Sequence, residues 1–578
     1  MSDDGSFNTG QRKAVSSKIT PAYELANSDH YLGVARRHLT ASISEHEKIR
    51  QFSCSPAVDG PKELQKLVNH RLHGSPGGVL AALSEECWAD ILYTYDEEIG
   101  LQYPFLDIAD LQRDISQAVH QRADGYFSQH DQISDIATLI LAVVAIFTDS
   151  DSAEISNALV QNIFTDAIAR THLAGGDRQS LSLLTLTSIY FFLTDREILA
   201  WRGIGTVSRL LQELRGHRND DLPHMATSAS PKADDNVSEK MYWTVYTLDR
   251  RWSFGTGLPF SIQDTDVRHY PQFSDDSLSA LYLEHMVIYC GITSEVRRWC
   301  LDAPLAAAAT ANSMCDLLCF RVIMWQRNLP AKLQFRGLQD AFDAAKESRG
   351  TYKIRLTLYL RANQMRTVIY RKAAVRPGTR DFDPSHANIM AATAQDTVRI
   401  LDSLARSTNI YQTQQKTFNH FLETALSSLL LVLCCSVDPE NRSCLDEVFT
   451  ALELVRQLST RSSVSRRLQD KLQTFQAVVT SLQAEMQHAG TVDISCGSAN
   501  ASPGPTASAS VSGDLDPVAS FRGPLANGFS VPVQPVLPLQ TTAACCSSSA
   551  DCETSNVPLF RCPELTDYLM GFNSSLFI

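Results

Sequence analysis

The stretch of this chain that decides its fold is Glu239–Pro271, EKMYWTVYTLDRRWSFGTGLPFSIQDTDVRHYP. Its first half carries apolar residues every three or four positions, which is the spacing of one buried face of an α-helix. These residues are Met241, Val245, Leu248 and Trp252. Gly255 and Gly257 then interrupt the pattern, because glycine disfavours a helix interior. The stretch therefore predicts a buried helix that ends in an irregular loop.

Three carboxylates in this stretch invite a catalytic interpretation: Asp249, Asp264 and Asp266. Carboxylates can bind a metal ion or transfer protons. However, no histidine and no nucleophile motif converges with them in the sequence. The alternative is that Asp249 pairs with a nearby arginine, since a buried carboxylate needs a cationic partner. We favour this structural role and expect the chain not to be an enzyme.

Helical periodicity continues over residues 79–490, and convincing β-strand patterns are absent from the sequence. Ser84 is placed to cap the first of these helices. Thr194 and Glu197 have the spacing of a capping box, and Gly216 is a candidate stop for the helix that follows. We therefore predict an all-α fold, in which residues 79–490 form one large domain of many packed helices.

The two ends of the chain differ from this domain. Residues 1–78 are rich in turn-forming clusters and predict a mostly irregular segment. Residues 491–578 contain two basic and seven acidic residues, a net charge of −5, and predict a disordered tail. Acidic and hydrophobic residues alternate at its end, as in activation segments, with Tyr568, Leu569 and Phe572 as the candidate contact residues. The alternative is that this end docks on the surface of the domain.

Composition limits the classes of protein that remain. The chain has 578 residues and a formal net charge of −13, whereas a surface that binds nucleic acid is normally basic. Its most apolar runs, Ile136–Phe147 and Ala425–Cys435, fall short of the roughly 20 residues of a membrane span. The start, MSDDGSFNTG, does not have the pattern of a signal peptide. We expect no membrane association and reduced cysteines, as in the cytoplasm or nucleus.

Cysteine pairs are the main candidates for a metal site. Cys315 and Cys319 lie four positions apart and would share one helix face. No histidine or cysteine nearby in the sequence completes four ligands, so we interpret them as buried thiols. The sequence thus predicts no metal site and no cofactor in this chain.

Glu239–Pro271 resembles the signature of the fungal-specific transcription factor domain, also called the middle homology region. That signature is a W-x-x-Y-x-x-D-R helix followed by a glycine-proline loop. The matching positions in this chain are Trp243, Tyr246, Asp249, Arg250, Gly257 and Pro259. Further stretches are similar to the family in the same order: Tyr93–Leu106, Leu183–Arg218 with its Ala200-Trp201 junction, Trp325–Leu333 and Leu358–Arg371. The resemblance is strong from Ser84 to Arg371 and looser as far as His488.

The resemblance implies a transcription regulator that acts in the nucleus on metabolic or secondary-metabolite genes. As partners it implies transcription machinery or a coactivator, and for some members a second copy of the chain or a small effector. The family binds DNA through a binuclear zinc cluster of six closely spaced cysteines, but only Cys54 lies upstream of the domain here. We therefore expect zinc, and direct DNA contact, only if such a cluster is encoded before Met1. The alternative is a cluster-less protein that modulates a zinc-cluster transcription factor without binding DNA itself.

Overall fold

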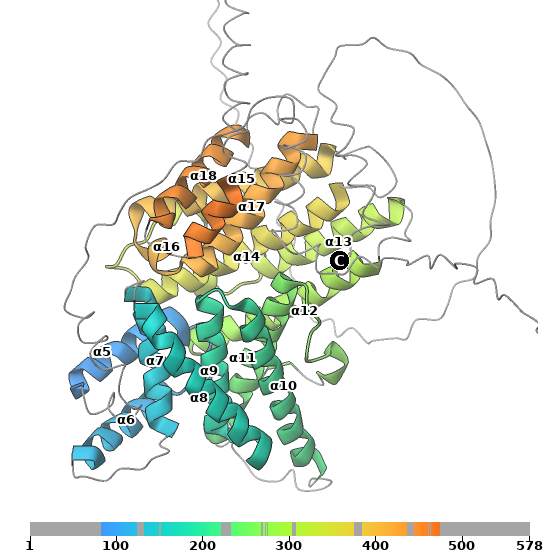
Figure 1. The fold of residues 1–578 in the computed structure, drawn as a ribbon. Helices are drawn as coiled ribbons and strands as arrows, with labels where there is room; N and C mark the ends of the chain where they lie inside the picture. Colours follow the sequence, from blue (N-terminus) through green and yellow to red (C-terminus); the bar gives the residue numbers. More distant parts are fainter. Residues whose placement is uncertain are drawn as a thin grey trace, which may run out of the picture. The chain divides into compact units, whose positions relative to one another are not determined.

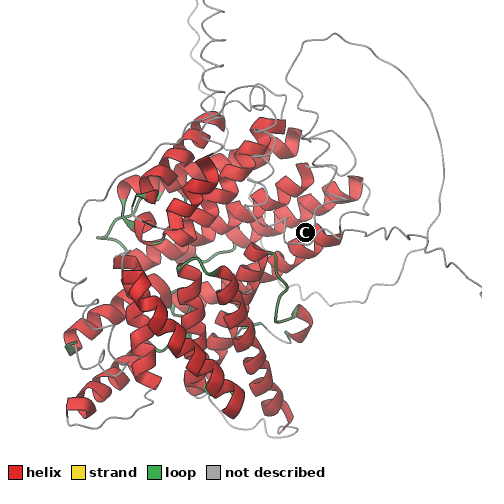
Figure 2. Cartoon of the chain, viewed as in Figure 1, coloured by secondary structure: helices red, strands yellow, loops and turns green. Residues whose placement is uncertain are grey.

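The computed structural model describes residues 83–473, except 124–131, 149–151, 221–232, 268–269, 272, 274, 303–307, 375–383, 436–443, 461 and 463. Every regular element in this part of the chain is a helix, and none of it is strand (Figure 2). The prediction of an all-α fold is therefore confirmed. The predictions for residues 1–78 and for the tail, including Tyr568, Leu569 and Phe572, concern residues outside the described ones.

All of the described residues belong to one compact unit.

Helices of the first half of the described region surround α9, as the blue to green ribbon of Figure 1 shows. The elements are α5 (Glu85–Tyr95), the π-helical turn η1 (Asp96–Gly100), α6 (Ile108–Ala123), α7 (Gln132–Thr148), α8 (Ser152–Ala174), α9 (Arg178–Leu193), α10 (Glu197–Asp220) and α11 (Ala233–Thr256). Helix α9 contacts α7, α8 and α10, and nearly all of its residues are buried. A helix that is covered on every side belongs to the core of a large domain.

The second half continues the same helical packing. Its elements are η2 (Asp264–Asp266), α12 (Leu278–Asp302), α13 (Ala308–Arg327), η4 (Ala331–Leu333), η5 (Gly337–Gln339), α14 (Arg349–Ala374), α15 (Pro384–Ser407), α16 (Ile410–Thr413), α17 (Gln415–Cys435) and α18 (Leu445–Ser459). Residues 464–473 form a further helical segment. Each helix from α10 to α15 contacts the next one, and α14, α15 and α17 contact one another. One hydrophobic core therefore runs through both halves.

The first helix begins as the sequence predicts. The Oγ atom of Ser84 accepts a hydrogen bond from the N–H of Cys87 at 3.3 Å, which caps α5. At its other end α5 widens into η1, against which the start of α14 packs. Gly350 permits this close approach, because a Cβ atom there would lie 2.6 Å from Leu101 Cδ1 and 2.7 Å from the Glu97 carbonyl oxygen.

A buried ion pair fastens η1 to α14. Lys353 Nζ lies 2.8 Å from Glu98 Oε2, and Arg349 Nε lies 2.5 Å from Glu98 Oε1. The side-chain amide of Gln414 donates a further hydrogen bond to Glu98 Oε2 at 2.6 Å. Burial by itself raises the pKa of Glu98, but Lys353, Arg349 and Gln414 outweigh it and lower that pKa from 4.5 to about 2. Glu98 is therefore an ionised, fully partnered carboxylate.

Two of the predicted helix boundaries are wrong. The hydroxyl of Thr194 donates to the carbonyl oxygen of Tyr190 at 2.9 Å, so it completes the end of α9 and does not cap α10. Asp195 follows in the left-handed region, with φ of 65°, as often occurs just after a helix. Helix α10 then continues through Gly216 to Asp220. A single glycine costs only about 1 kcal/mol in a helix, which is too little to end one.

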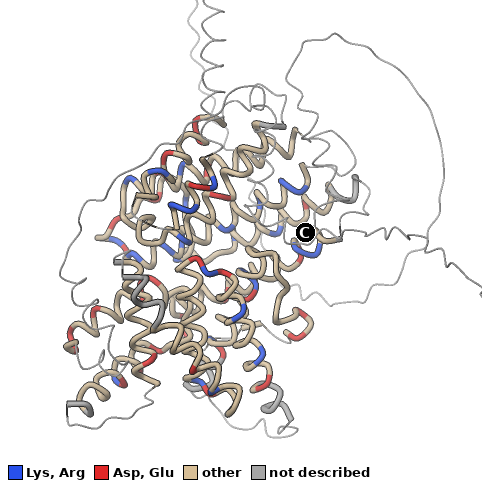
Figure 3. Tube along the Cα trace, viewed as in Figure 1, with Lys and Arg blue, Asp and Glu red and all other residues tan. Residues whose placement is uncertain are grey.

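No described helix is long and apolar enough to cross a membrane. The two most apolar runs of the sequence lie in α7 and α17, and their described residues are largely buried in the core. Figure 3 shows basic and acidic positions interspersed among the described helices.

Candidate functional site

The signature helix α11 lies in the core. Trp243 is completely buried, and its ring makes edge-to-face contacts with Tyr242 and Tyr246 at centroid distances of 5.1 and 5.4 Å. Its indole N–H donates to Glu239 Oε1 at 3.3 Å. Asp249 and Arg250, near the end of the helix, are also completely buried. Buried charges of this kind require partners, and the loop that follows the helix supplies them.

Asp249 holds the loop by its backbone. Its carboxylate accepts hydrogen bonds from the N–H of Ser261 at 2.9 Å and from the N–H of Ile262 at 3.2 Å. Arg250 Nη1 lies 3.2 Å from Asp249 Oδ2. Burial raises the pKa of the Asp249 carboxyl, and the two backbone hydrogen bonds and Arg250 oppose that rise. Asp249 thus fixes the loop where it turns back toward the helix.

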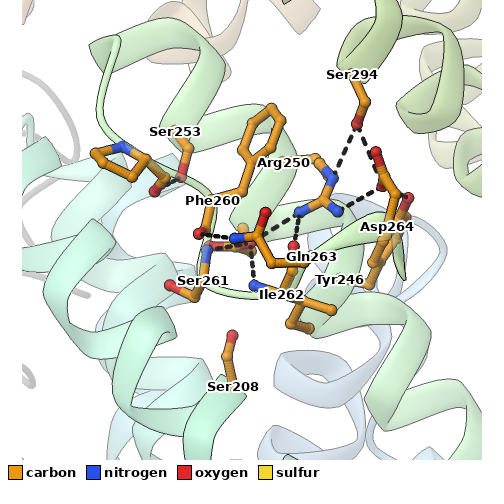
Figure 4. Close-up of polar contacts among 12 residues, drawn as sticks. Ser208, Tyr246, Arg250, Ser253, Phe260, Ser261, Ile262, Gln263, Asp264 and Ser294 are labelled. Atoms are coloured by element: carbon orange, nitrogen blue, oxygen red, sulfur yellow. Dashed lines mark hydrogen bonds and ion pairs between the residues drawn. The ribbon is translucent and has the colours of Figure 1, made fainter. Parts of the chain in front are cut away.

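Arg250 joins the helix, the loop and α12, as Figure 4 shows. Its guanidinium donates to the carbonyl oxygen of Ile262 at 2.5 Å, to Asp264 Oδ1 at 2.6 Å and to Ser294 Oγ at 3.1 Å. The same group lies over the rings of Tyr246 and Phe260, 4.6 and 4.3 Å from their centroids. A planar guanidinium suits this arrangement, because it can donate in its plane and stack on aromatic faces. We call Asp249, Arg250 and their loop partners the signature clasp.

Trp201, Pro259 and Gly257, which also belong to the signature, make further contacts around the same loop. The indole N–H of Trp201, on α10, donates to Ser253 Oγ at 3.1 Å and to the carbonyl oxygen of Pro259 at 3.2 Å. Gly257 has φ of 74°, a conformation that side chains rarely adopt, and its carbonyl oxygen accepts from Arg297 at 3.3 Å. Ala200 is completely buried. The structure therefore brings together residues that the sequence separates by more than fifty positions.

The three carboxylates that invited a catalytic interpretation do not converge. Asp249 and Asp264 each contact Arg250, whereas Asp266 is exposed and accepts a hydrogen bond from Thr265 at 3.4 Å. Within the described part of the chain they do not form a group of neighbouring ligand atoms. Their geometry is that of a structural clasp.

Cys315 lies near a histidine that is distant from it in the sequence. Ligand atoms of Cys315, Asp316 and His386 lie within 4.8 Å of one another. His386 stands in the first turn of α15, so the fold and not the sequence spacing brings it to α13. Cys315 and Cys319 are both buried, as expected for thiols in a core.

A cavity of about 520 Å³ borders the C-terminal part of the signature helix. Residues that line it come from α9, α10, α11, α12, α14, α17 and the last described segment; they include Phe192, Leu199, Arg251, Trp252, Tyr289, Arg361, His420 and Leu468. Burial lowers the pKa of His420 to about 4, so its ring is neutral at pH 7. Sequence reasoning missed this cavity, because its walls are far apart in the chain.

Residues 93–282 match the family model described as the fungal specific transcription factor domain. About a third of the chain is therefore similar to this domain. A stretch of 147 residues is also 28% identical to an uncharacterized transcriptional regulatory protein of Schizosaccharomyces pombe. That stretch is 25% of this chain and 18% of the relative, so the chain matches less than a fifth of the relative's length. No solved structure is significantly similar to the chain.

The matched residues 93–282 include most of the signature clasp, from Trp201 to Asp264. Ser294, which completes the contacts of Arg250, lies just beyond the matched residues. The cavity likewise combines Arg251 from inside the match with Arg361 from beyond it. Both the signature clasp and the cavity therefore include residues from helices that follow the matched stretch.

Proposed function

We propose that this chain is a transcription regulator that acts in the nucleus and controls metabolic or secondary-metabolite genes. The match of residues 93–282 to the fungal specific transcription factor domain carries the proposal. The name of the Schizosaccharomyces pombe relative, a transcriptional regulatory protein, supports the same role. Since the match covers 18% of that relative, the proposal rests on the shared domain and not on the rest of the relative.

The chemistry of the signature supports a regulatory role over a catalytic one. The polar atoms of Asp249 and Arg250 are engaged by the protein's own backbone and side chains, at distances of 2.5 to 3.2 Å. A catalytic acid or metal ligand needs an atom that can reach a substrate or an ion. As the resemblance to the family implies, we propose that the helical domain holds regulatory partners, such as a second copy of the chain, or a small effector, and that the acidic tail recruits transcription machinery or a coactivator.

A second candidate is a regulator that binds a zinc-cluster transcription factor and does not contact DNA itself. The charge of the chain favours it, since the formal net charge is −13 and basic positions in the described helices are interspersed with acidic ones (Figure 3). DNA binding draws its affinity mainly from basic groups that neutralise phosphates. In this case a partner supplies the DNA contact.

One experiment distinguishes the two candidates. Transcripts are compared between a strain that lacks the gene and the same strain complemented with it, and chromatin immunoprecipitation then tests the promoters that respond. We expect a restricted set of genes to change and their promoters to be occupied by a chain that a fluorescent fusion locates in the nucleus. Occupancy that disappears when a co-purifying zinc-cluster protein is deleted would favour the second candidate. Unchanged transcripts together with no promoter occupancy would refute both.

A further inference from the structure

Arg251 and Arg361 line the cavity, and neither has an acidic partner among the described residues. Arg361, on α14, is only 5% exposed, and Arg251, on α11, is partly buried. Within the described ranges no carboxylate pairs with either guanidinium, and the Nε atom of each is buried without a hydrogen-bond partner. Arg251 Nη1 instead donates to the hydroxyl of Tyr103, and Arg361 lies 5.7 Å from the ring centroid of Phe421. Burying a cation without an anion is costly, so such a pair calls for an explanation.

The positive charge of Arg251 also disfavours the charged form of Arg361. Burial and, after it, the positive charge of Arg251 lower the pKa of Arg361. Tyrosine hydroxyls at positions 103, 282 and 289 partly offset this, but a hydroxyl carries no charge at neutral pH. An anion between the two arginines would offset both the cost of burying the guanidinium of Arg361 and its repulsion by Arg251.

Three of the other four basic residues that line the cavity form ion pairs. Lys416 forms ion pairs with Asp195 and with Glu197, at 2.5 Å to the latter, and Arg467 pairs with Asp195 at 2.5 Å. Lys471 lies 3.9 Å from Glu423. In total six basic and three acidic residues line the cavity, so its wall has a formal charge of +3 in a chain of net charge −13. This local excess of positive charge favours an anionic ligand.

The remaining wall is apolar and aromatic. Trp252 stacks on Phe192, with centroids 5.1 Å apart and an interplanar angle of 19°. Phe254, Met365 and Leu468 extend this surface. The indole N–H of Trp252 is buried and has no hydrogen-bond partner among the described residues. A volume of about 520 Å³ lies within the usual range for sites that hold a small organic molecule.

We propose that this cavity binds a small organic anion, with a carboxylate or phosphate group held by Arg251 and Arg361 and an apolar body against Trp252 and Phe192. Guanidinium groups recognise either oxyanion through paired hydrogen bonds. This inference goes beyond the role in transcription, because binding is measured on the purified chain whether or not it regulates genes.

The test uses the full 578-residue chain and three probes with the same ring: benzoate, phenyl phosphate and the neutral benzamide. Calorimetry and thermal melting measure the affinity and the stabilisation that each probe gives. We expect saturable binding of benzoate, phenyl phosphate or both, with a Kd on the order of 1 mM, and no saturable binding of benzamide. Benzoate alone would identify a carboxylate as the preferred group, and phenyl phosphate alone a phosphate ester. Binding of neither anion, or equal binding of benzamide, would overturn the proposal.

Matched variants locate the binding. Arg361→Met should weaken anion binding by about tenfold or more without lowering the melting temperature of the free chain, because it removes an unpaired buried charge. Arg399→Met, on α15 and outside the cavity wall, is the control and should leave the affinity unchanged. If Arg361→Met does not fold, the affinity of Arg251→Met for the anion is measured in its place. Unchanged affinity in a folded cavity variant, or failure of both cavity variants to fold, would overturn the proposal and assign the arginines a structural role.

Discussion

Replacing Asp249 with alanine tests the signature clasp directly. The carboxylate is completely buried and holds the N–H groups of Ser261 and Ile262. Removing it leaves both backbone donors without their acceptor, and each such donor costs about 1–3 kcal/mol when buried. Arg250 loses one of its two acidic contacts at the same time. We therefore expect Asp249→Ala to lower the free energy of unfolding by roughly 3–5 kcal/mol.

Asp264→Ala provides the matched control. Asp264 contacts the same guanidinium at 2.6 Å, but its side chain is 38% exposed, so water can replace the lost oxygen. We expect this variant to cost about 1–2 kcal/mol, and Trp243→Ala, which opens a cavity in the core, about 3–5 kcal/mol. Urea denaturation followed by far-ultraviolet circular dichroism measures all three.

The relative decreases in the free energy of unfolding show whether the clasp is stabilised by the backbone hydrogen bonds of Asp249. If Asp264→Ala costs as much as Asp249→Ala, the backbone hydrogen bonds are not the source of the stability. If Asp249→Ala leaves the unfolding curve unchanged and abolishes transcriptional control, Asp249 belongs to a functional contact and the structural account of the clasp is wrong.

Three further predictions concern other parts of the chain. The pKa of Glu98 is lowered from 4.5 to about 2, so its ion pairs stabilise the fold fully above pH 4.5 and are lost as the pH falls toward 2, a difference of about 3 kcal/mol. Glu98→Gln should flatten the pH dependence of the unfolding free energy between these two pH values. An unchanged pH profile would contradict this prediction. The purified 578-residue chain should contain no stoichiometric zinc by elemental analysis and should not prefer one operator over scrambled duplex DNA; salt-resistant, nanomolar binding to a single site would disprove this. Residues 491–578, fused to an unrelated DNA-binding domain, should activate a reporter, and alanine at Tyr568, Leu569 and Phe572 should abolish that activation at equal expression; if the fusion is silent and these substitutions destabilise the helical domain, the tail end docks intramolecularly.

Helical periodicity was enough to predict α11, because a buried helix repeats its apolar residues within one short stretch. The same reasoning predicted that Asp249 pairs with an arginine, and the arginine beside it is the partner that the structure contains. It could not predict that Asp249 also fastens Ser261 and Ile262, since those contacts depend on the path of the loop. Local spacing likewise predicted that Thr194 caps α10, but Thr194 lies between two helices, and its hydroxyl instead donates to Tyr190 at the end of α9.

Contacts between distant elements were beyond the reach of the sequence. Glu98 and Lys353 each sit in a stretch that shows nothing unusual, yet they form a buried ion pair between η1 and α14. His386 comes close to Cys315 in the same way. Such pairs depend on which helices pack against each other. The periodicity of a single sequence shows which face of a helix is buried, but not which other helix covers that face.

The adjacent residues Arg250 and Arg251 show how one helix serves two purposes. Successive residues of an α-helix point about 100° apart, so the two side chains leave α11 on different faces. Arg250 lies among the acids and carbonyls of the clasp, whereas Arg251 lines a cavity without an acidic partner. Their consequences are therefore separable by experiment. A change at the clasp should appear in the unfolding free energy of the chain without ligand, while a change at the cavity should appear in the affinity for an anion.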